Sequence, residues 1–217
     1  MTLASPPLVL VTGFSPFPGA PVNPSAVVAR RLAEGSLGRR LGIRIAAHVF
    51  PTTYRALADL PAVVAAFEPD ACLHLGIAAR SRFMRIETRA TNFAAPFLPD
   101  AEGLAPDQGM IEPGAGRFRG STIPVRRIRD RIAGAGLPAR LSGSAGRYLC
   151  NACLWHSLAL ADRDGSARPT GFLHLPVTVE SMPRRPRGPA PRPTFTISDL
   201  LRAAELAIQE ISTILPT

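Results

Sequence analysis

The chain has no lysine. All of its 25 basic residues are arginines, and against 16 acidic residues they give a formal net charge of +9. Such a charge is compatible with a nucleic acid or an acidic surface as partner. The arginines are scattered, however, and aromatic residues make up only 6% of the chain, which leaves few rings on which bases could stack. We therefore expect no nucleic acid among the partners.

Cysteine is also scarce. The chain has three cysteines, Cys72, Cys150 and Cys153. Such a small, odd number argues against a framework of disulfide bonds and favours free thiols in a reducing compartment. We therefore expect a cytoplasmic protein.

Long apolar runs are missing as well. No stretch approaches the roughly 20 apolar residues that a membrane-spanning helix needs, so no membrane is expected as partner. The N-terminal segment lacks the basic start and small-residue cleavage site of a secretory signal. Its short apolar run, residues 8–12, is instead predicted to be the first core strand.

The sequence has the material for one sizeable core. Hydrophobic residues make up 46% of its 217 residues and charged residues 19%, which predicts a single domain over residues 1–217. Three apolar runs (8–12, 43–50 and 71–76) alternate with two helical segments (23–35 and 54–67). This βαβαβ order favours a parallel sheet covered by helices on both faces.

The rest of the chain continues less regularly. Residues 83–93 read as an extended strand, and a long loop rich in proline and glycine follows. Further helices and strands are then predicted at residues 125–136, 139–144, 151–163, 171–177 and 197–212. The segment 183–193, rich in arginine and proline, is expected to be a mobile surface loop.

Three residues have side chains of the types that nucleophilic acyl transfer requires. Cys150 opens a predicted helix, where the positive end of the helix would favour a thiolate. His174 lies in the strand 171–177, and Glu87 is the only carboxylate between Asp70 and Asp100. A thiol, an imidazole and a carboxylate can serve as nucleophile, proton shuttle and orienting group. The alternative is a buried, inert thiol and a core histidine.

The spacing of Cys150 and Cys153 leaves two other readings open. A pair of cysteines three residues apart can form a dithiol that cycles with a disulfide, as in an oxidoreductase. It can also supply half of a zinc site, with His156 on the same helix. A zinc site needs about four ligands, and the remaining candidates belong to separate predicted strands: His48, Cys72 and His74. We therefore expect no metal site.

Four motifs occur in one order along the chain. They are VLVTGFSPFPGAPVNPS (9–25), PD with EG (99–103), SAGRYLCN (144–151) and GFLHLPV (171–177). Together they resemble the pyroglutamyl peptidase I family, cysteine peptidases that remove an N-terminal pyroglutamyl residue. The resemblance extends over about residues 8–212.

The resemblance implies a fold and a set of catalytic roles. The fold would be a three-layer α/β/α sandwich around a mostly parallel twisted sheet. Cys150 would be the nucleophile, His174 the general base and acid, and Glu87 the orienting carboxylate. A pyroglutamyl peptide would be cleaved through a thioester without a cofactor, and Cys153 would be a neighbour that faces the core. Self-association into a homo-oligomer is also plausible by resemblance.

The resemblance also implies a substrate pocket. It would be lined by Phe14 and Phe17, with Asn23 bracing the loop that carries them. A flat, uncharged lactam ring offers little for an ion pair to hold, so aromatic faces and backbone hydrogen bonds suit it. The two phenylalanines could instead anchor the loop in the core.

Two positions differ from the family pattern. Thr88 stands where an arginine is usual, and Phe97 stands where the family has an arginine near the oxyanion. Losing one oxyanion donor can cost roughly 100- to 1000-fold in rate. Arg85 or Arg89 could compensate. A weakly active or non-catalytic relative that binds peptide N-termini therefore remains an alternative.

Overall fold

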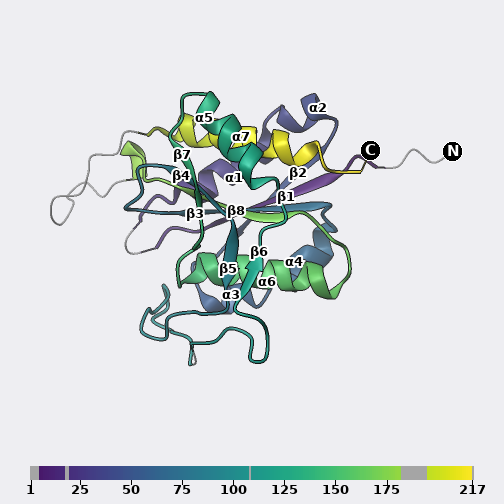
Figure 1. The fold of residues 1–217 in the computed structure, drawn as a ribbon. Helices are drawn as coiled ribbons and strands as arrows, with labels where there is room; N and C mark the ends of the chain where they lie inside the picture. The colour runs from purple at the N-terminus through teal and green to yellow at the C-terminus, as the bar shows by residue number, and fades with distance from the viewer. Residues whose placement is uncertain (1–4, 18–19, 108, 182–194, 217) are drawn as a thin grey trace.

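A six-stranded sheet forms the centre of the protein in a computed structural model, which describes residues 5–17, 20–107, 109–181 and 195–216. The predicted loop 183–193 lies outside the described residues. The strands follow the order β2-β1-β3-β8-β4-β7 (Figure 1). Their bounds are β1 Leu8–Phe14, β2 Arg44–Phe50, β3 Ala71–Ile77, β4 Met84–Glu87, β7 Ala139–Ser142 and β8 Thr170–Leu175.

The sheet is mostly parallel. Strands β2, β1, β3 and β8 run in one direction. Strand β4 pairs antiparallel with β8, and β7 pairs parallel with β4, so these last two strands run the other way. The reversal between β8 and β4 is the feature of the sheet that positions the candidate site.

Helices cover both faces, which confirms the three-layer sandwich (Figure 1). One face carries α1 Pro24–Glu34, α2 Leu37–Leu41, α5 Val125–Gly134 and α7 Ile197–Ser212. The other carries α3 Tyr54–Leu57, α4 Leu60–Phe67 and α6 Leu149–Arg163. The helices of each face bury apolar residues against the sheet in a separate cluster, so the molecule has one core above the sheet and one below.

Helix α1 begins as its sequence predicts. The side chain of Asn23 accepts a hydrogen bond from the backbone N–H of Ser25, and Pro24 occupies the first helical position. The start of the helix lies directly against β1. A Cβ at Gly13 would come within 2.6 Å of the carbonyl oxygen of Ser25, so only glycine allows this approach.

Several elements differ from their predicted bounds. The predicted helix 54–67 is divided into α3 and α4, with Pro61 in the first turn of the second, as the restart near Pro61 anticipates. Helix α6 begins at Leu149, two residues earlier than predicted. A two-stranded ribbon, β5 Arg89–Thr91 with β6 Phe118–Gly120, was not predicted as a pair. Three-residue strands have no periodicity to detect, and here a long-range pairing forms them. The structure also has a short 3₁₀ turn at Val179–Ser181.

Candidate active site

The three predicted catalytic residues come from three elements that meet beside the reversal in the sheet. Glu87 is the last residue of β4, His174 lies near the end of β8, and Cys150 is in the first turn of α6. In the antiparallel register, Arg85 lies opposite His174 and Glu87 lies opposite Phe172. Because strand side chains alternate between faces, these four side chains share one face of the sheet.

The imidazole and the carboxylate form a buried pair. The Nδ1 atom of His174 lies 2.8 Å from Oε1 of Glu87. Glu87 is 0% exposed and His174 only 5%. A carboxylate in this position accepts the Nδ1 proton and leaves Nε2 of the imidazole for a thiol or a substrate.

Arg85 belongs to the same cluster. Its Nη2 atom lies 3.0 Å from the same Oε1 atom of Glu87 and also donates to the hydroxyl of Ser142 at 2.8 Å and the carbonyl of Ser144 at 2.5 Å. Arg89, the other arginine considered for the oxyanion, donates from Nε to the carbonyl of Gly143 at 3.0 Å. Arg85 therefore holds the carboxylate of Glu87, a contact for which the sequence offers no local signal.

A glycine makes room for the sulfur of Cys150. A Cβ at Gly76 would lie 2.8 Å from Sγ of Cys150 and 2.7 Å from the ring of Phe172. Gly76 is also the neighbour of His174 in the register of β3 with β8. The sulfur thus lies over the end of β3, next to the strand that carries the histidine. The only sequence signal for this role is a glycine near the end of an apolar strand.

The thiol and the imidazole interact electrostatically. Burial by itself lowers the pKa of His174, but the charge of Cys150, a side-chain hydrogen bond with Cys150 and the Glu87 carboxylate together raise this pKa to about 9. These neighbours favour the imidazolium form of His174. The thiol, imidazole and carboxylate are therefore brought together in the arrangement that nucleophilic acyl transfer requires.

The second cysteine of the pair faces the core, as expected. Cys153 is 0% exposed, and burial, with the charges of Cys150 and Cys72, raises the pKa of its thiol well above its ordinary value. In a dithiol cycle the second thiol must lose its proton to attack the mixed disulfide at the first. The burial of Cys153 opposes that step, so the structure does not favour an oxidoreductase. Among the described residues, no group of three or more histidines, cysteines and carboxylates is placed to hold a metal ion.

The loop after β1 carries the predicted substrate residues. Phe14 is 3% exposed and packs 6.4 Å from Phe50, in the apolar cluster that Cys150 contacts, whereas Phe17 is half-buried. The buried amide of Asn23 donates to the carbonyl of Ser15 at 3.1 Å. Asn23 therefore braces this loop in addition to capping α1.

Two tyrosines pack against each other beside Cys150: Tyr148 belongs to the SAGRYLCN motif, whereas Tyr54 has no signal in the sequence. Tyr54 and Tyr148 meet edge to face with ring centroids 5.8 Å apart, and the Tyr148 hydroxyl donates to the carbonyl of Pro99 at 3.1 Å. The carboxylate of Asp100 accepts a hydrogen bond from the backbone N–H of Tyr54 at 2.8 Å. The Pro-Asp motif thus ties its loop to both tyrosines, while Phe97 in the same loop is 70% exposed.

An α/β sandwich with a thiol, an imidazole and a buried carboxylate in one cluster defines a class, the cysteine-type hydrolases. The comparison with protein families narrows this class to one family, because the family model described as pyroglutamyl peptidase matches residues 8–213. The chain belongs to the pyroglutamyl peptidase family.

Relatives and solved structures agree with this assignment. The chain is 35% identical over 204 residues to the pyrrolidone-carboxylate peptidase of Gloeobacter violaceus, covering 93% of this chain and 95% of the relative. It is 32% identical to that of Pyrococcus furiosus, with coverages of 93% and 96%. The crystal structure of Bacillus amyloliquefaciens pyroglutamyl peptidase I superposes with a TM-score of 0.85 at 27% identity, over 95% of this chain and 97% of that one.

Proposed function

We propose that the protein is a cysteine peptidase that hydrolyses the amide bond after an N-terminal pyroglutamyl residue. The observation that carries the proposal is the cluster of Cys150, His174 and Glu87 on this fold. The imidazole lies 2.8 Å from the carboxylate, and the sulfur lies over Gly76, the neighbour of His174 in the sheet. Membership of the pyroglutamyl peptidase family supplies the substrate class.

The cluster supports a two-step reaction. The Cys150 thiolate attacks the pyroglutamyl carbonyl, and the backbone N–H groups in the first turn of α6 are placed to stabilise the oxyanion, because they lack partners within the helix. The C–N bond breaks as Nε2 of His174 gives its proton to the leaving amine, which leaves a thioester. His174 then takes a proton from water, whose oxygen attacks the thioester and releases pyroglutamate and the thiolate. Glu87 keeps the imidazole in the required tautomer throughout.

The loop after β1 is proposed to bind the lactam. The aromatic faces of Phe14 and Phe17 suit a flat, uncharged ring, and Asn23 holds the loop that presents them. The interactions of Asn23 with Ser15 and Ser25 support this bracing role.

The test is release of a fluorophore from a pyroglutamyl amide. Replacing the nucleophile, Cys150→Ala or Cys150→Ser, is expected to abolish turnover because no thioester can form. The matched control is Cys153→Ala, three residues further along the same helix, which is expected to retain turnover. Turnover that persists without the Cys150 thiol would refute the proposed function, and loss of turnover in the Cys153 variant as well as in the Cys150 variants is the result that a dithiol cycle requires.

One observation keeps a second candidate open, namely a weakly active or non-catalytic relative that binds peptide N-termini. Phe97 occupies the position where the family resemblance leads us to expect an arginine, and Arg85 is bound to Glu87. Rapid acid quenching followed by mass spectrometry separates the two candidates. A pyroglutamyl adduct on Cys150 is expected for the peptidase, and binding of the peptide without an adduct is expected for the binding protein.

Two finer expectations stay predictions. None of the described helices is long and apolar enough to cross a membrane, and a cytoplasmic location is still proposed from the sparse, free cysteines. A homo-oligomer is proposed from the resemblance, and sedimentation of the purified protein tests it.

A further inference from the structure

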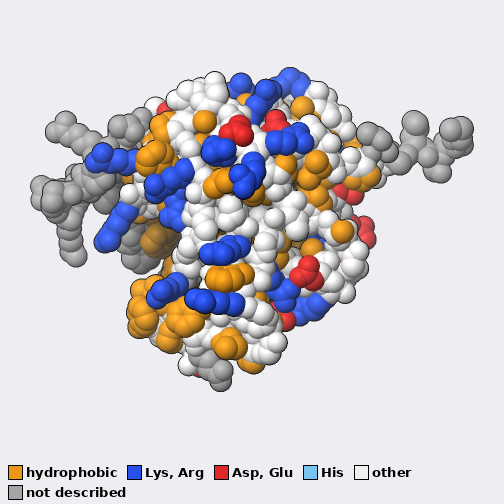
Figure 2. Space-filling model, in the orientation of Figure 1, with side chains coloured by type: hydrophobic (Ala, Val, Ile, Leu, Met, Phe, Trp, Pro, Cys, Tyr) orange, Lys and Arg blue, Asp and Glu red, His pale blue; other side chains and the backbone are white. Residues whose placement is uncertain are grey.

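A groove of about 500 Å³ lies next to the catalytic turn and has no part in the mechanism above. We call it the arginine groove. It is lined by three arginines, two phenylalanines and five small or polar residues: Arg89, Arg117, Arg147, Phe93, Phe118, Thr91, Asn92, Gly143, Ser144 and Gly146. Figure 2 shows basic and hydrophobic side chains side by side on this part of the surface.

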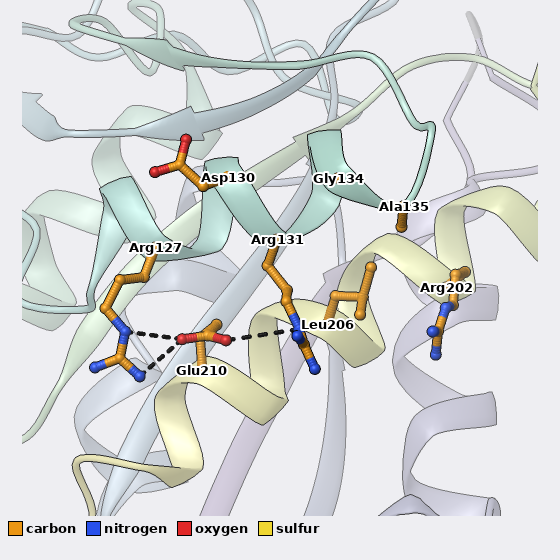
Figure 3. A pocket seen from close by; sticks show the side chains of 8 residues that line it. All are labelled: Arg127, Asp130, Arg131, Gly134, Ala135, Arg202, Leu206 and Glu210. Carbon is orange, nitrogen blue, oxygen red and sulfur yellow. Dashed lines mark hydrogen bonds and ion pairs between the residues drawn. The ribbon is translucent and has the colours of Figure 1, made fainter.

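The arginine groove is positively charged, and no acidic side chain among the described residues that line it balances this charge. None of the described residues that line it is acidic, and none of its three arginines forms an ion pair with a described carboxylate. A groove of about 820 Å³ between α5 and α7, on the other face of the sheet, differs in this respect. There Glu210 pairs with Arg127 at 2.8 Å and with Arg131 at 3.7 Å (Figure 3). Of these two grooves in the described part of the chain, the arginine groove is the one whose arginines form no ion pair and are available to an added anion.

Aromatic rings hold these guanidinium groups in place. Arg89 and Arg117 both stack on Phe118, at 4.0 and 5.1 Å from the ring centroid, and Arg147 lies 5.6 Å from the ring of Phe93. Arg89 is held further by its hydrogen bond to Gly143. Stacking on a ring leaves the N–H groups in the plane of the guanidinium free to donate hydrogen bonds. A guanidinium that is already held in position loses less conformational entropy when it binds a carboxylate.

The arginine groove is tied to both sides of the nucleophile. Asn151, the residue after Cys150, exchanges hydrogen bonds with the backbone of Thr91 at 2.8 and 2.7 Å. Before the nucleophile, the carbonyl of Arg147 accepts a hydrogen bond from the N–H of Ala95 at 2.8 Å. Arg147 of the groove lies close before Cys150 in the chain. Since an extended peptide spans about 3.3 Å per residue, we expect the residues after the scissile bond to reach the arginine groove.

From these observations we propose that the arginine groove is a subsite for a carboxylate on the leaving portion of the peptide. The carboxylate comes either from an acidic side chain beyond the scissile bond or from the C-terminus of a short peptide. This inference rests on the proposed function and deepens it, because it makes acidic pyroglutamyl peptides the preferred substrates. Arginine forks match the two oxygens of a carboxylate.

Matched peptides test the proposal, with kcat/KM as the readout. Pyroglutamyl-Ala-Glu-Ala-amide is compared with its glutamine counterpart for the side-chain source. Pyroglutamyl-Ala-Ala is compared with its C-terminal amide for the terminal source. At least one acidic member is expected to be cleaved about three- to tenfold faster than its neutral partner. The preference is expected to shrink in roughly 0.5 M salt because the charges are exposed.

Substitutions of the groove's arginines test whether the preference for acidic peptides arises in the arginine groove. The double variant Arg117→Ala/Arg147→Ala is expected to bring the acidic-to-neutral ratio to about one, and a general loss of activity does not change this ratio. The control is Arg126→Ala, an exposed arginine on α5, which is expected to keep the preference. Equal rates for both pairs in the unmodified protein, or a preference that survives the double variant, would overturn the proposal.

A second measurement separates this proposal from the proposed function. A pyroglutamyl amide of a fluorophore has no downstream carboxylate, so its turnover reports the proposed function alone. If that turnover is absent, calorimetry with the same four peptides still tests the arginine groove. Tighter binding of an acidic member, lost in the double variant, supports the subsite, and equal binding throughout rejects it.

Discussion

One carboxylate oxygen organises the candidate active site at the scale of single residues. Oε1 of Glu87 lies within hydrogen-bonding distance of both Nδ1 of His174 and Nη2 of Arg85. The other oxygen, Oε2, is buried and has no partner among the described residues. We therefore expect the position of the imidazole to depend on how firmly Arg85 holds this carboxylate, and we propose Arg85 as a positioning residue.

Replacing Arg85 tests this dependence. In Arg85→Met the carboxylate loses its charged donor, so kcat on a pyroglutamyl amide is expected to fall by about ten- to a hundredfold. KM is expected to change little, because no role in binding substrate is assigned to Arg85. Loss of a positive neighbour also favours the imidazolium, which raises the pKa of His174 further. The alkaline limb of the pH profile is therefore expected to move to higher pH.

The conservative variant provides the control. Arg85→Lys keeps a cation near Glu87 and is expected to restore part of kcat and to return the alkaline limb toward its original position. If Arg85→Met leaves both kcat and the pH profile unchanged, Arg85 has no positioning role.

At the scale of elements, the site depends on how closely helix α6 approaches strand β3. The first turn of α6 brings Cys150 over Gly76, and the strand pairing of β3 with β8 sets Gly76 beside His174. The side chain of Asn151 adds three hydrogen bonds to the segment at residues 91–93, which anchor the same turn from the other side. The first turn of α6 is therefore held between the end of β3 and the segment at residues 91–93.

A methyl group at Gly76 is expected to disturb this approach. The added Cβ of Gly76→Ala would lie 2.8 Å from Sγ of Cys150 and 2.7 Å from Phe172, so the thiol or the helix must shift. Because a displacement of about 1 Å can cost on the order of 100-fold in rate, kcat/KM on a pyroglutamyl amide is expected to fall by about that factor.

The matched control for Gly76 is Gly134→Ala in helix α5, where an added Cβ meets nothing within 4 Å. This variant is expected to keep full activity and to gain roughly 0.5–1 kcal/mol of stability from the better helix former. Full activity in Gly76→Ala would show that the sulfur does not depend on this clearance.

At the scale of the whole molecule, the two cores differ in what they enclose. The core under α1, α5 and α7 is apolar, whereas the sheet face under α6 also buries titratable groups. His74 lies among these groups. Its Nδ1 atom is 2.7 Å from the hydroxyl of Thr12, its Nε2 atom has no partner among the described residues, and burial lowers its pKa to about 4. The folded state therefore keeps this imidazole neutral.

This buried imidazole makes stability dependent on pH. The ordinary pKa of a histidine is 6.5, and that of His74 in the folded state is about 4. Between these two pH values the unfolded chain takes up a proton at His74 that the folded state does not. The free energy of unfolding is therefore expected to fall as the pH drops through this window, by up to about 1.4 kcal/mol per pH unit. Urea unfolding at a series of pH values measures the slope.

The variant His74→Asn isolates the contribution of this histidine. Whatever its overall stability, the slope between about pH 6.5 and 4 is expected to become shallower, because the titrating group has been removed. An unchanged slope would assign the acid sensitivity to other groups.

The sequence by itself determined the local structure and the chemical parts of this protein. The apolar periodicities gave the strands and helices, Asn23 with Pro24 marked the start of α1, and the motifs around Cys150 and His174 indicated a cysteine peptidase. These signals are readable because each depends on residues close in the chain, where side-chain period and capping chemistry are set.

Only the tertiary structure decided how these parts meet. The antiparallel pairing of β4 with β8 places Arg85 and Glu87 around His174, and the clearance at Gly76 admits the sulfur. The pairing of β5 with β6 likewise brings the stacked arginines beside the catalytic turn. Such contacts join segments tens of residues apart. They follow from burial and strand pairing across the whole fold, which local propensity does not encode.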